Sequence, residues 1–437
     1  MIQLKQKPGL IMELLSMCGC MNHKAMMRMF YNTAERNNCL SRTTKLHETV
    51  KRIKRREGKM EAGFCLTEKG RKSLLCDYDT TPNVSLYVIG NTPENCMEIK
   101  EDAVQKRGRK LGDLLVAFYL LGYGILYTEK PDYFEVGPEV VRRCRVLLEE
   151  MDVDAKNVSL RRINLEKIVQ PAGDETELLS RVMYDLMSKK KCEKNVRIGG
   201  IKEEKRRENR KSCFFTAREI KTSARDIASL KMSRTMGVLV TEKKSYLVYY
   251  PGERSMRWNK QQELNMMIYV QEMLGQQMIY GKKESRLSKD RLNNLFIVKN
   301  YDVILNILLM RFKNNLKGDS FDDLRTYFST LEDLVLVLDN DLRKRFSQKL
   351  VQKYKIEIKE KKLYYQGEKC YIGAIFQLQA ARVMEEGRVV FCLRSQEKLY
   401  QYFKVTPIFV DEVLEETKRG CLNEVKEQGY EKYGRYL

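Results

Sequence analysis

Residues 7–76 carry the pattern that most restricts the fold, because apolar side chains recur there at helical spacing over short segments. Pro8 suits the first position of a helix that runs to Cys18. Asn22 is a suitable cap for a second helix, which continues to Phe30. The pattern therefore predicts a compact helical module that also contains a hairpin.

A third helix is expected after Ser41, which is a suitable cap. Leu46, Val50 and Ile53 follow at positions i, i+4 and i+7, and they would form its buried face. The opposite face would carry Thr44, Lys45, Glu48, Lys51, Arg52 and Arg55. A helix with one apolar side and a basic outer side is suited to the groove of a nucleic-acid duplex.

Two short strand-like pieces around glycine turns follow between Arg56 and Leu66, and they predict the hairpin. The motif Leu66-Thr67-Glu68-Lys69-Gly70 then begins another short helix, with Thr67 as its cap. Three helices, a hairpin and this motif resemble the winged helix-turn-helix of many bacterial DNA-binding proteins. The resemblance implies that residues 1–80 form a domain that binds double-stranded DNA.

The charge of the chain agrees with such a partner. The 437 residues hold 81 Lys and Arg against 59 Asp and Glu, a formal net charge of +22, and nucleic acid is the commonest partner of so basic a protein. Residues 1–72 alone hold 16 Lys and Arg against six Glu. The expected DNA contacts are Thr44, Lys45, Lys51, Arg52, Arg55 and Lys59. A protein-docking scaffold, whose winged helix binds another protein, is one alternative.

The rest of the chain predicts a larger mixed α/β body, so the fold class is α+β or α/β. Strand-like and helical runs alternate over the last 150 residues, and the expected strands include Leu334–Leu338, Val389–Leu393 and Ile408–Val410. Residues 189–211 hold 11 positive and four negative charges, which is typical of a solvated linker. The expected divisions are an α/β segment 83–188, a basic linker 189–212, a strand, hairpin and long helix 213–285, and a C-terminal α/β domain 286–437.

Glu219-Ile220-Lys221 follows a strand-like run that ends at Thr216, and it predicts an alternative, enzymatic function. A Glu-x-Lys that leaves a strand is half of the restriction-type nuclease or nickase site, in which carboxylates hold Mg²⁺ and Lys221 would help to activate water. Such a site also needs an aspartate on a neighbouring strand. No Pro-Asp pair lies shortly upstream of Glu219, since Pro131-Asp132 is about 90 residues away. A surface charge pair or a degenerate nuclease fold is the competing interpretation.

Asp339 and Asp341 directly follow the expected strand Leu334–Leu338. Paired acids at the carboxyl end of a strand can bind a divalent ion. Asp and Asn are also the ordinary caps of a following helix, and capping is the interpretation that we favour. Because the chain contains neither a P-loop nor a Rossmann glycine fingerprint, no cofactor is expected, with Mg²⁺ as the exception if the protein is a nuclease.

Histidine and cysteine usage restricts the chemistry and the compartment. His23 and His47 are the two histidines of the chain, which excludes multi-histidine metal sites. Twelve scattered cysteines without a Cys-x-x-Cys pair are typical of free thiols in a reducing cytoplasm. The longest uncharged apolar stretch, residues 114–127, has 14 residues, short of the ~20 that a spanning helix needs, and a strongly apolar helix over Gly112–Leu121 is expected there. We expect a cytoplasmic protein with no membrane partner.

Four segments carry a wider resemblance: Leu66–Gly70, Arg109–Leu115, Phe214–Lys221 and Ser233–Gly237. With the winged helix and the α/β body, they resemble the replication-relaxation (MobC-type) proteins of plasmids and conjugative elements. The resemblance implies an accessory DNA-binding role in plasmid replication or conjugative transfer, with other replication or transfer proteins as further partners. It also implies a body related to restriction-nuclease folds. Because no aspartate lies shortly upstream of Glu219, we expect a DNA-binding protein of a mobile genetic element that is not an enzyme.

Overall fold

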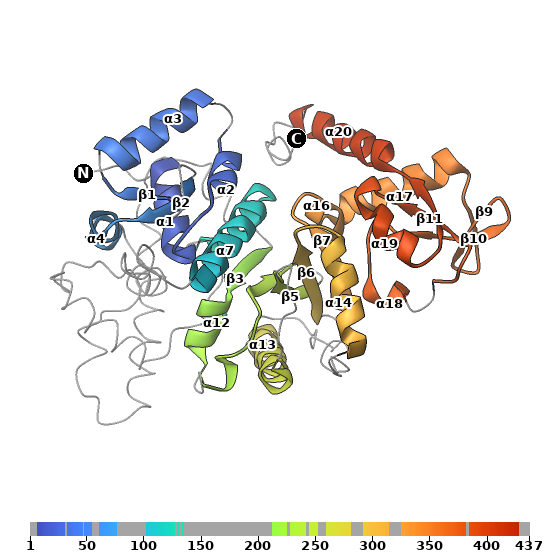
Figure 1. Ribbon diagram of the computed structural model, residues 1–437, viewed down its shortest axis with the longest axis horizontal. Coiled ribbons are helices and arrows are strands. Elements are labelled where there is room, and N and C mark those ends of the chain that lie inside the picture. The colour runs from blue at the N-terminus through green and yellow to red at the C-terminus, as the bar shows by residue number, and fades with distance from the viewer. Residues whose placement is uncertain are drawn as a thin grey trace. The chain divides into compact units, whose positions relative to one another are not determined.

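The computed structural model is a mixed α/β protein with three β-sheets in its described residues (Figure 1). The structure describes residues 7–30, 33–46, 48–54, 61–76, 102–126, 129–130, 133–134, 212–224, 228–241, 244–251, 259–280, 292–313, 325–381 and 384–427. The chain divides into two compact units, of which the first comprises residues 1–214 and 218–225 and the second residues 215–217 and 226–437. The expected basic linker 189–212 lies, except for Ser212, outside the described residues, as does most of the segment 83–188.

The first unit begins with three short helices that precede a two-stranded sheet (Figure 1). Its elements are α1 (Lys7–Cys18), α2 (His23–Arg28), α3 (Thr33–Ser41), a π-helical turn (Arg42–Leu46), β1 (Val50–Lys54), β2 (Glu61–Leu66), α4 (Glu68–Cys76) and α7 (Asp102–Leu120). The Asn22 side chain accepts a hydrogen bond from Ala25 N at 2.6 Å, so the expected cap of α2 is confirmed. Helix α7 confirms the apolar helix expected around Gly112–Leu121.

Residues 50–54, expected within the third helix, form strand β1 instead, so that prediction is wrong. The helical segment begins at Thr33 and ends with the π-helical turn at Leu46. Glu48 then adopts a left-handed backbone with a φ of 53°, which a continuing α-helix does not accommodate. The β-branched residues of β1 pair antiparallel with β2, a partner that the periodicity of one segment cannot reveal.

The motif Leu66–Gly70 forms a tight joint between the hairpin and α4. The Thr67 hydroxyl donates to Glu48 O at 2.6 Å and accepts from Gly70 N at 3.0 Å, so Thr67 caps α4 as expected. The Thr67 N–H donates to Thr49 O at 3.0 Å. A Cβ on Gly70 would lie 2.1 Å from the same Thr49 oxygen, so a glycine is required for this close approach.

Gly70→Ala is therefore expected to lower the free energy of unfolding by about 1–3 kcal/mol, because the added methyl group has to separate α4 from Thr49. Gly420→Ala is the matched control, since Gly420 lies in the helix α20 (Asp411–Glu427) with Lys349 Nζ as its nearest neighbour at 3.9 Å. There, alanine should raise the free energy of unfolding by about 0.5–1 kcal/mol. Urea unfolding followed by circular dichroism measures both changes in the free energy of unfolding. Changes of the same sign would contradict the close contact between Gly70 and Thr49.

Helix α7 packs closely on the ends of α1 and α2. A Cβ on Gly108 would lie 2.6 Å from Cys18 O, so the helix meets backbone at this point. Asn22 donates its amide hydrogen to the Asp113 carboxylate, which links α7 to the cap of α2. Burial raises the pKa of Asp113 to about 6, against the lowering effects of the Asn22 hydrogen bond and of nearby cations such as Arg28.

Asp113 is expected to make the first unit less stable as the pH rises. Because its pKa is higher in the folded chain (about 6) than the ordinary value of 3.8, the folded state binds more protons, and the free energy of unfolding falls between pH 4 and 6. Asp113→Asn keeps an acceptor for Asn22 and removes the charge, so it should raise the free energy of unfolding at pH 7 by about 2 kcal/mol. Denaturant unfolding of both proteins at pH 4, 5, 6 and 7 checks this, and a difference that does not vary with pH would contradict it.

Two five-stranded sheets follow, and they belong to the second unit except for Cys213 and Phe214; residues 218–223 of the first helix in this part also belong to the first unit. From residue 213 onward the elements are β3 (Cys213–Thr216), α12 (Ala217–Ser223), β4 (Gly237–Val240), β5 (Ser245–Tyr249), α13 (Lys260–Tyr280), β6 (Leu292–Val298), α14 (Asp302–Lys313), β7 (Thr326–Thr330), α16 (Leu334–Leu338), α17 (Asn340–Tyr354), β8 (Glu357–Lys359), β9 (Lys362–Tyr365), β10 (Glu368–Ile372), α18 (Leu378–Ala381), β11 (Val389–Cys392), α19 (Glu397–Tyr402), β12 (Thr406–Phe409) and α20. Short 3₁₀ turns cover Ala228–Leu230 and Arg394–Gln396.

The first of these sheets has the strand order β3-β4-β5-β6-β7. Strands β4 and β5 form the expected hairpin, and β5, β6 and β7 run parallel. Stacked rings cross the sheet, with centroids 4.9 Å apart for Tyr249 and Phe296 and 5.1 Å apart for Phe296 and Phe328. Helix α13 inserts the buried Glu263, which accepts hydrogen bonds from Tyr249 Oη at 3.2 Å and Ser233 Oγ at 2.9 Å. The core of this sheet is therefore aromatic, with one satisfied carboxylate.

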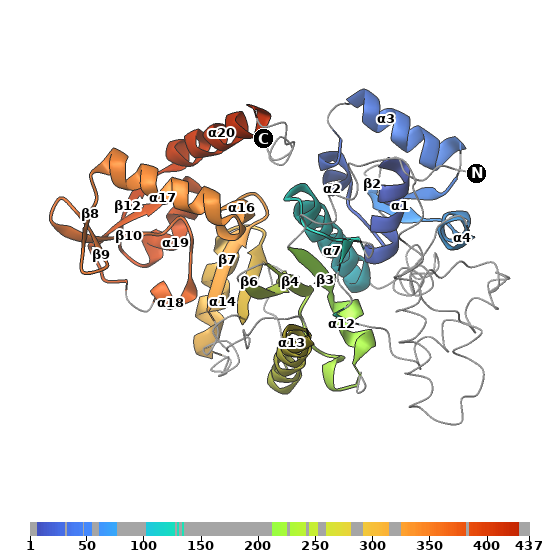
Figure 2. The same cartoon turned by 180° about the vertical axis from the view of Figure 1, so that it is seen from behind.

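The other sheet has the order β12-β11-β10-β9-β8, and helices α17 and α20 lie side by side over it (Figure 2). Phe346 and Leu350 of α17 and Val413 of α20 pack with Cys370 and Phe391 of the strands in one apolar core. The expected strands at residues 389–393 and 408–410 are confirmed as β11 and β12.

Leu334–Leu338, expected to be a strand, is the helix α16, so that prediction is also wrong. All five side chains are buried, and a short run of buried apolar residues has no period that distinguishes a helix from a strand. A turn at 331–333 follows β7 directly and leads into the helix.

The eight cysteines whose side chains the structure describes are free thiols, and all of them are buried. They are Cys18, Cys20, Cys39, Cys65, Cys213, Cys370, Cys392 and Cys421. Burial raises the pKa of Cys213 and of Cys392 to about 12. For these eight, the expectation of free thiols is confirmed. Across the same described ranges, every helix is too short or too polar to span a bilayer.

Candidate nucleic-acid interface

Exposed cations lie on two consecutive elements of the first unit, namely the helical segment that ends at Leu46 and strand β1. Lys45 is exposed in the π-helical turn, and Lys51 and Arg52 are exposed on β1. Thr44 is half-buried, and its hydroxyl donates to Leu40 O at 2.6 Å within the helix. The structure thus brings three of the expected basic residues to the surface at the junction of a helix and a hairpin.

Backbone and side-chain hydrogen bonds fix this junction. The Thr49 N–H, just before β1, donates to Thr43 O at 2.8 Å, and the Thr43 hydroxyl donates to Cys39 O at 3.0 Å. In the hairpin, Lys51 is paired with Cys65, and Arg52 with Phe64. Both partners are fully buried, whereas Lys51 and Arg52, as neighbours along a strand, are exposed on opposite sides of the hairpin.

Arg55 and Lys59, the other expected contacts, lie in the connection 55–60, outside the described residues. The expected contacts leave out further exposed cations of this unit, among them Lys24 on α2 and Arg42 in the π-helical turn. Arg42 was missed because the third helix was expected to begin at Ser41, which placed this residue outside the basic face. The high Lys and Arg content of residues 1–72 was the available signal for both.

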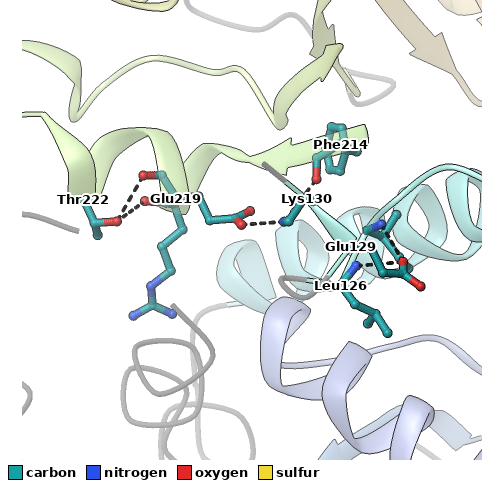
Figure 3. Close-up of polar contacts among 8 residues, drawn as sticks. Leu126, Glu129, Lys130, Phe214, Glu219 and Thr222 are labelled. Atoms are coloured by element: carbon teal, nitrogen blue, oxygen red, sulfur yellow. Dashed lines mark hydrogen bonds and ion pairs between the residues drawn. The ribbon is translucent and has the colours of Figure 1, made fainter. Parts of the chain in front are cut away.

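The Glu219 carboxylate is engaged in a buried ion pair (Figure 3). Helix α12 follows β3 directly and turns Glu219 inward, where Lys130 Nζ lies 2.5 Å from Glu219 Oε1. Lys130 also donates to Phe214 O at 3.2 Å. The two side chains are 1% and 3% exposed. Sequence analysis missed Lys130, since no local pattern links residues 89 positions apart.

Lys221 does not share the environment of Glu219. It is half-buried on α12, and two residues along a helix correspond to about 200° around the axis. Within the described residues, no three Asp, Glu, His or Cys side chains gather where they could hold a metal ion, and Asp132 lies outside those residues. An ammonium group therefore occupies the position next to Glu219 where the nuclease hypothesis needs a divalent cation.

Lys130→Met should lower the free energy of unfolding by about 3–5 kcal/mol, because it leaves the Glu219 carboxylate buried without its cation. The double variant Lys130→Met with Glu219→Met should recover most of that loss, since an apolar pair of similar volume replaces the ion pair. Urea unfolding of the two single variants and the double variant forms a complete double-mutant cycle. Additive losses would show that the two side chains do not interact.

Asp339 caps helix α17, which confirms the interpretation that we favoured for it. Its Oδ1 accepts from Asp341 N at 2.9 Å and from Leu342 N at 3.0 Å. Asp341 lies exposed in the first turn of the helix. Since the preceding apolar run is the helix α16, these acids do not lie at the end of a strand, as the divalent-ion hypothesis required.

No family model matches the chain, and neither a curated protein nor a solved structure matches it.

Proposed function

We propose that the first unit is a winged helix-turn-helix that binds double-stranded DNA. The observation that carries the proposal is the run of exposed cations Arg42, Lys45, Lys51 and Arg52 across a helix and the hairpin that follows it. In a winged helix, the last helix before the hairpin enters the major groove and the hairpin contacts the backbone. In this chain the helix would be Thr33–Leu46, and β1 with β2 would be the wing.

The four cations have different roles in this proposal. Arg42 and Lys45, on the helix, lie where base edges or the phosphates flanking a groove are contacted. Lys51 and Arg52, on the wing, supply contacts to phosphates, which position the protein without reading sequence. Arg55 and Lys59 remain proposed wing contacts because they belong to the same connection between β1 and β2. The formal charge of +22 supports the partner, since phosphate neutralisation dominates DNA affinity.

We place this activity in the cytoplasm, as an accessory function in plasmid replication or conjugative transfer. The resemblance of Leu66–Gly70 and of the other three segments to replication-relaxation proteins supports this setting. It also makes other replication or transfer proteins the proposed further partners. We propose a binding protein rather than a Mg²⁺-dependent nuclease, because the Glu219 carboxylate is already paired with Lys130.

Lys45→Ala and Arg52→Ala should each weaken binding to a duplex about 3- to 10-fold, because each removes one contact to phosphate or base. The slope of log affinity against log salt should become shallower by about one unit for a residue that contacts phosphate. Fluorescence anisotropy with labelled duplex at several salt concentrations measures both quantities.

Lys398→Ala is the matched control, since Lys398 is a 74% exposed lysine of α19 in the second unit. Unchanged affinity in both test variants would refute the assignment of this surface. Absence of duplex binding by the unmodified protein at low salt would instead favour the protein-docking scaffold.

A further inference from the structure

At the β8 end of the sheet of β8 to β12 (Figure 2), the strand register puts tyrosines and cations on one face. We call this surface the tyrosine–lysine face, and it consists of Lys359, Lys362, Tyr364, Lys369, Tyr371 and Arg388. It belongs wholly to the second unit, and it includes none of the residues of the proposed duplex interface.

Strand register places these side chains on one side of the sheet. Lys359 of β8 is paired with Lys362 of β9, and Lys369 of β10 is paired with Tyr364. Paired residues of neighbouring strands point to the same side, and so do residues two apart in one strand, which adds Tyr371. Leu363 and Cys370, which alternate with them, point to the other side and join the core under α17 and α20.

The cations lie close to the tyrosine rings. Lys359 Nζ is 5.9 Å from the centroid of the Tyr364 ring, and Lys369 Nζ is 5.8 Å from that of Tyr371. The Arg388 guanidinium lies 5.9 Å from the Tyr371 ring and donates to its hydroxyl at 2.8 Å. Each ring thus has positive charge over it at the distance of a cation–π contact, and a base that stacks on the same face of the ring has to move that flexible side chain aside.

The surface is accessible and carries an excess of positive charge. Lys359 and Lys362 are exposed, and both tyrosines are half-buried. Two carboxylates accompany the cations: Glu357 lies on the same face, opposite Tyr364 in the strand register, and pairs with Lys359 at 2.5 Å, and Glu385 pairs with Arg388. Four cations therefore face two acids, which leaves a net attraction for an anionic ligand.

From this face we infer a binding site for single-stranded DNA, distinct from the proposed duplex interface. Flat aromatic rings on a sheet are platforms on which unpaired bases stack, and lysines between them track the phosphates. A duplex cannot use the rings in this way, because its bases are already stacked on one another. An acidic peptide could use the cations, but it would leave the two rings without a matching group.

The test compares two oligonucleotides of about 20 nucleotides, an oligo(dT) and an abasic strand of equal length and charge. The full-length protein is expected to bind oligo(dT) at least about tenfold more tightly, since the abasic strand keeps the phosphates and lacks the bases. In the double variant Tyr364→Ala with Tyr371→Ala, this preference should fall to about twofold or less, with unchanged binding of the abasic strand. Anisotropy titrations measure all four affinities.

Two further variants separate stacking from a loss of structure. Tyr364→Phe with Tyr371→Phe keeps both rings, so it should retain the preference for oligo(dT). Tyr402→Ala removes a 48% exposed tyrosine of α19 outside the face and should also retain it. The inference is overturned if the unmodified protein shows no preference for bases, or if the double alanine variant keeps it. Duplex binding by Arg52→Ala is measured separately, so failure of either proposal leaves the other intact.

Discussion

The placement of β1 beside the helix that precedes it depends on one joint, which Thr49, Thr67 and Gly70 form. The Thr49 carbonyl oxygen accepts a hydrogen bond from the Thr67 N–H and lies against the backbone of Gly70. The Thr67 hydroxyl donates to the Glu48 carbonyl oxygen and accepts from the Gly70 N–H in the first turn of α4. A shift of β1 by one residue would break these contacts together. Residues that need not touch DNA therefore determine where Lys51 and Arg52 point. The motif Leu66–Gly70 thus has a structural role in fixing the backbone, whatever the function of the unit.

Sequence reasoning succeeded where a segment carries its own signal. Helix α1, the apolar part of α7, the β4–β5 hairpin and α13 have clear periodicity or turns, and the structure has all four. It failed where a distant partner decides. Strand β1 was read as helix because its partner is β2, and α16 was read as strand because full burial removes any period. The pairing of Glu219 with Lys130 could not be predicted for the same reason, since it arises from packing between segments that are remote in the sequence.

Charged side chains inside the two units differ from those on their surfaces in what surrounds them. The buried carboxylate of Glu219 is paired with Lys130, and that of Glu263 accepts from Ser233, Arg234 N and Tyr249, as the cost of burying a charge requires. Lys51 and Arg52 of β1 and Lys359 and Lys362 of the tyrosine–lysine face are exposed instead, where a phosphate can reach them. The two proposed surfaces differ in what accompanies the charge, a helix in one and aromatic rings in the other. They would therefore suit paired and unpaired strands of the same polymer.

The buried thiols can report the rate at which the structure around each of them opens. A cysteine reacts with an alkylating reagent as its thiolate, and a thiol with a pKa of about 12, such as Cys213 or Cys392, has almost none at neutral pH. Modification must then wait until the surrounding structure opens. Because Cys20 and Cys65 report on the first unit and Cys370 and Cys421 on the second, the labelling rate at each site, followed by mass spectrometry, would time the opening of each unit in the unmodified protein.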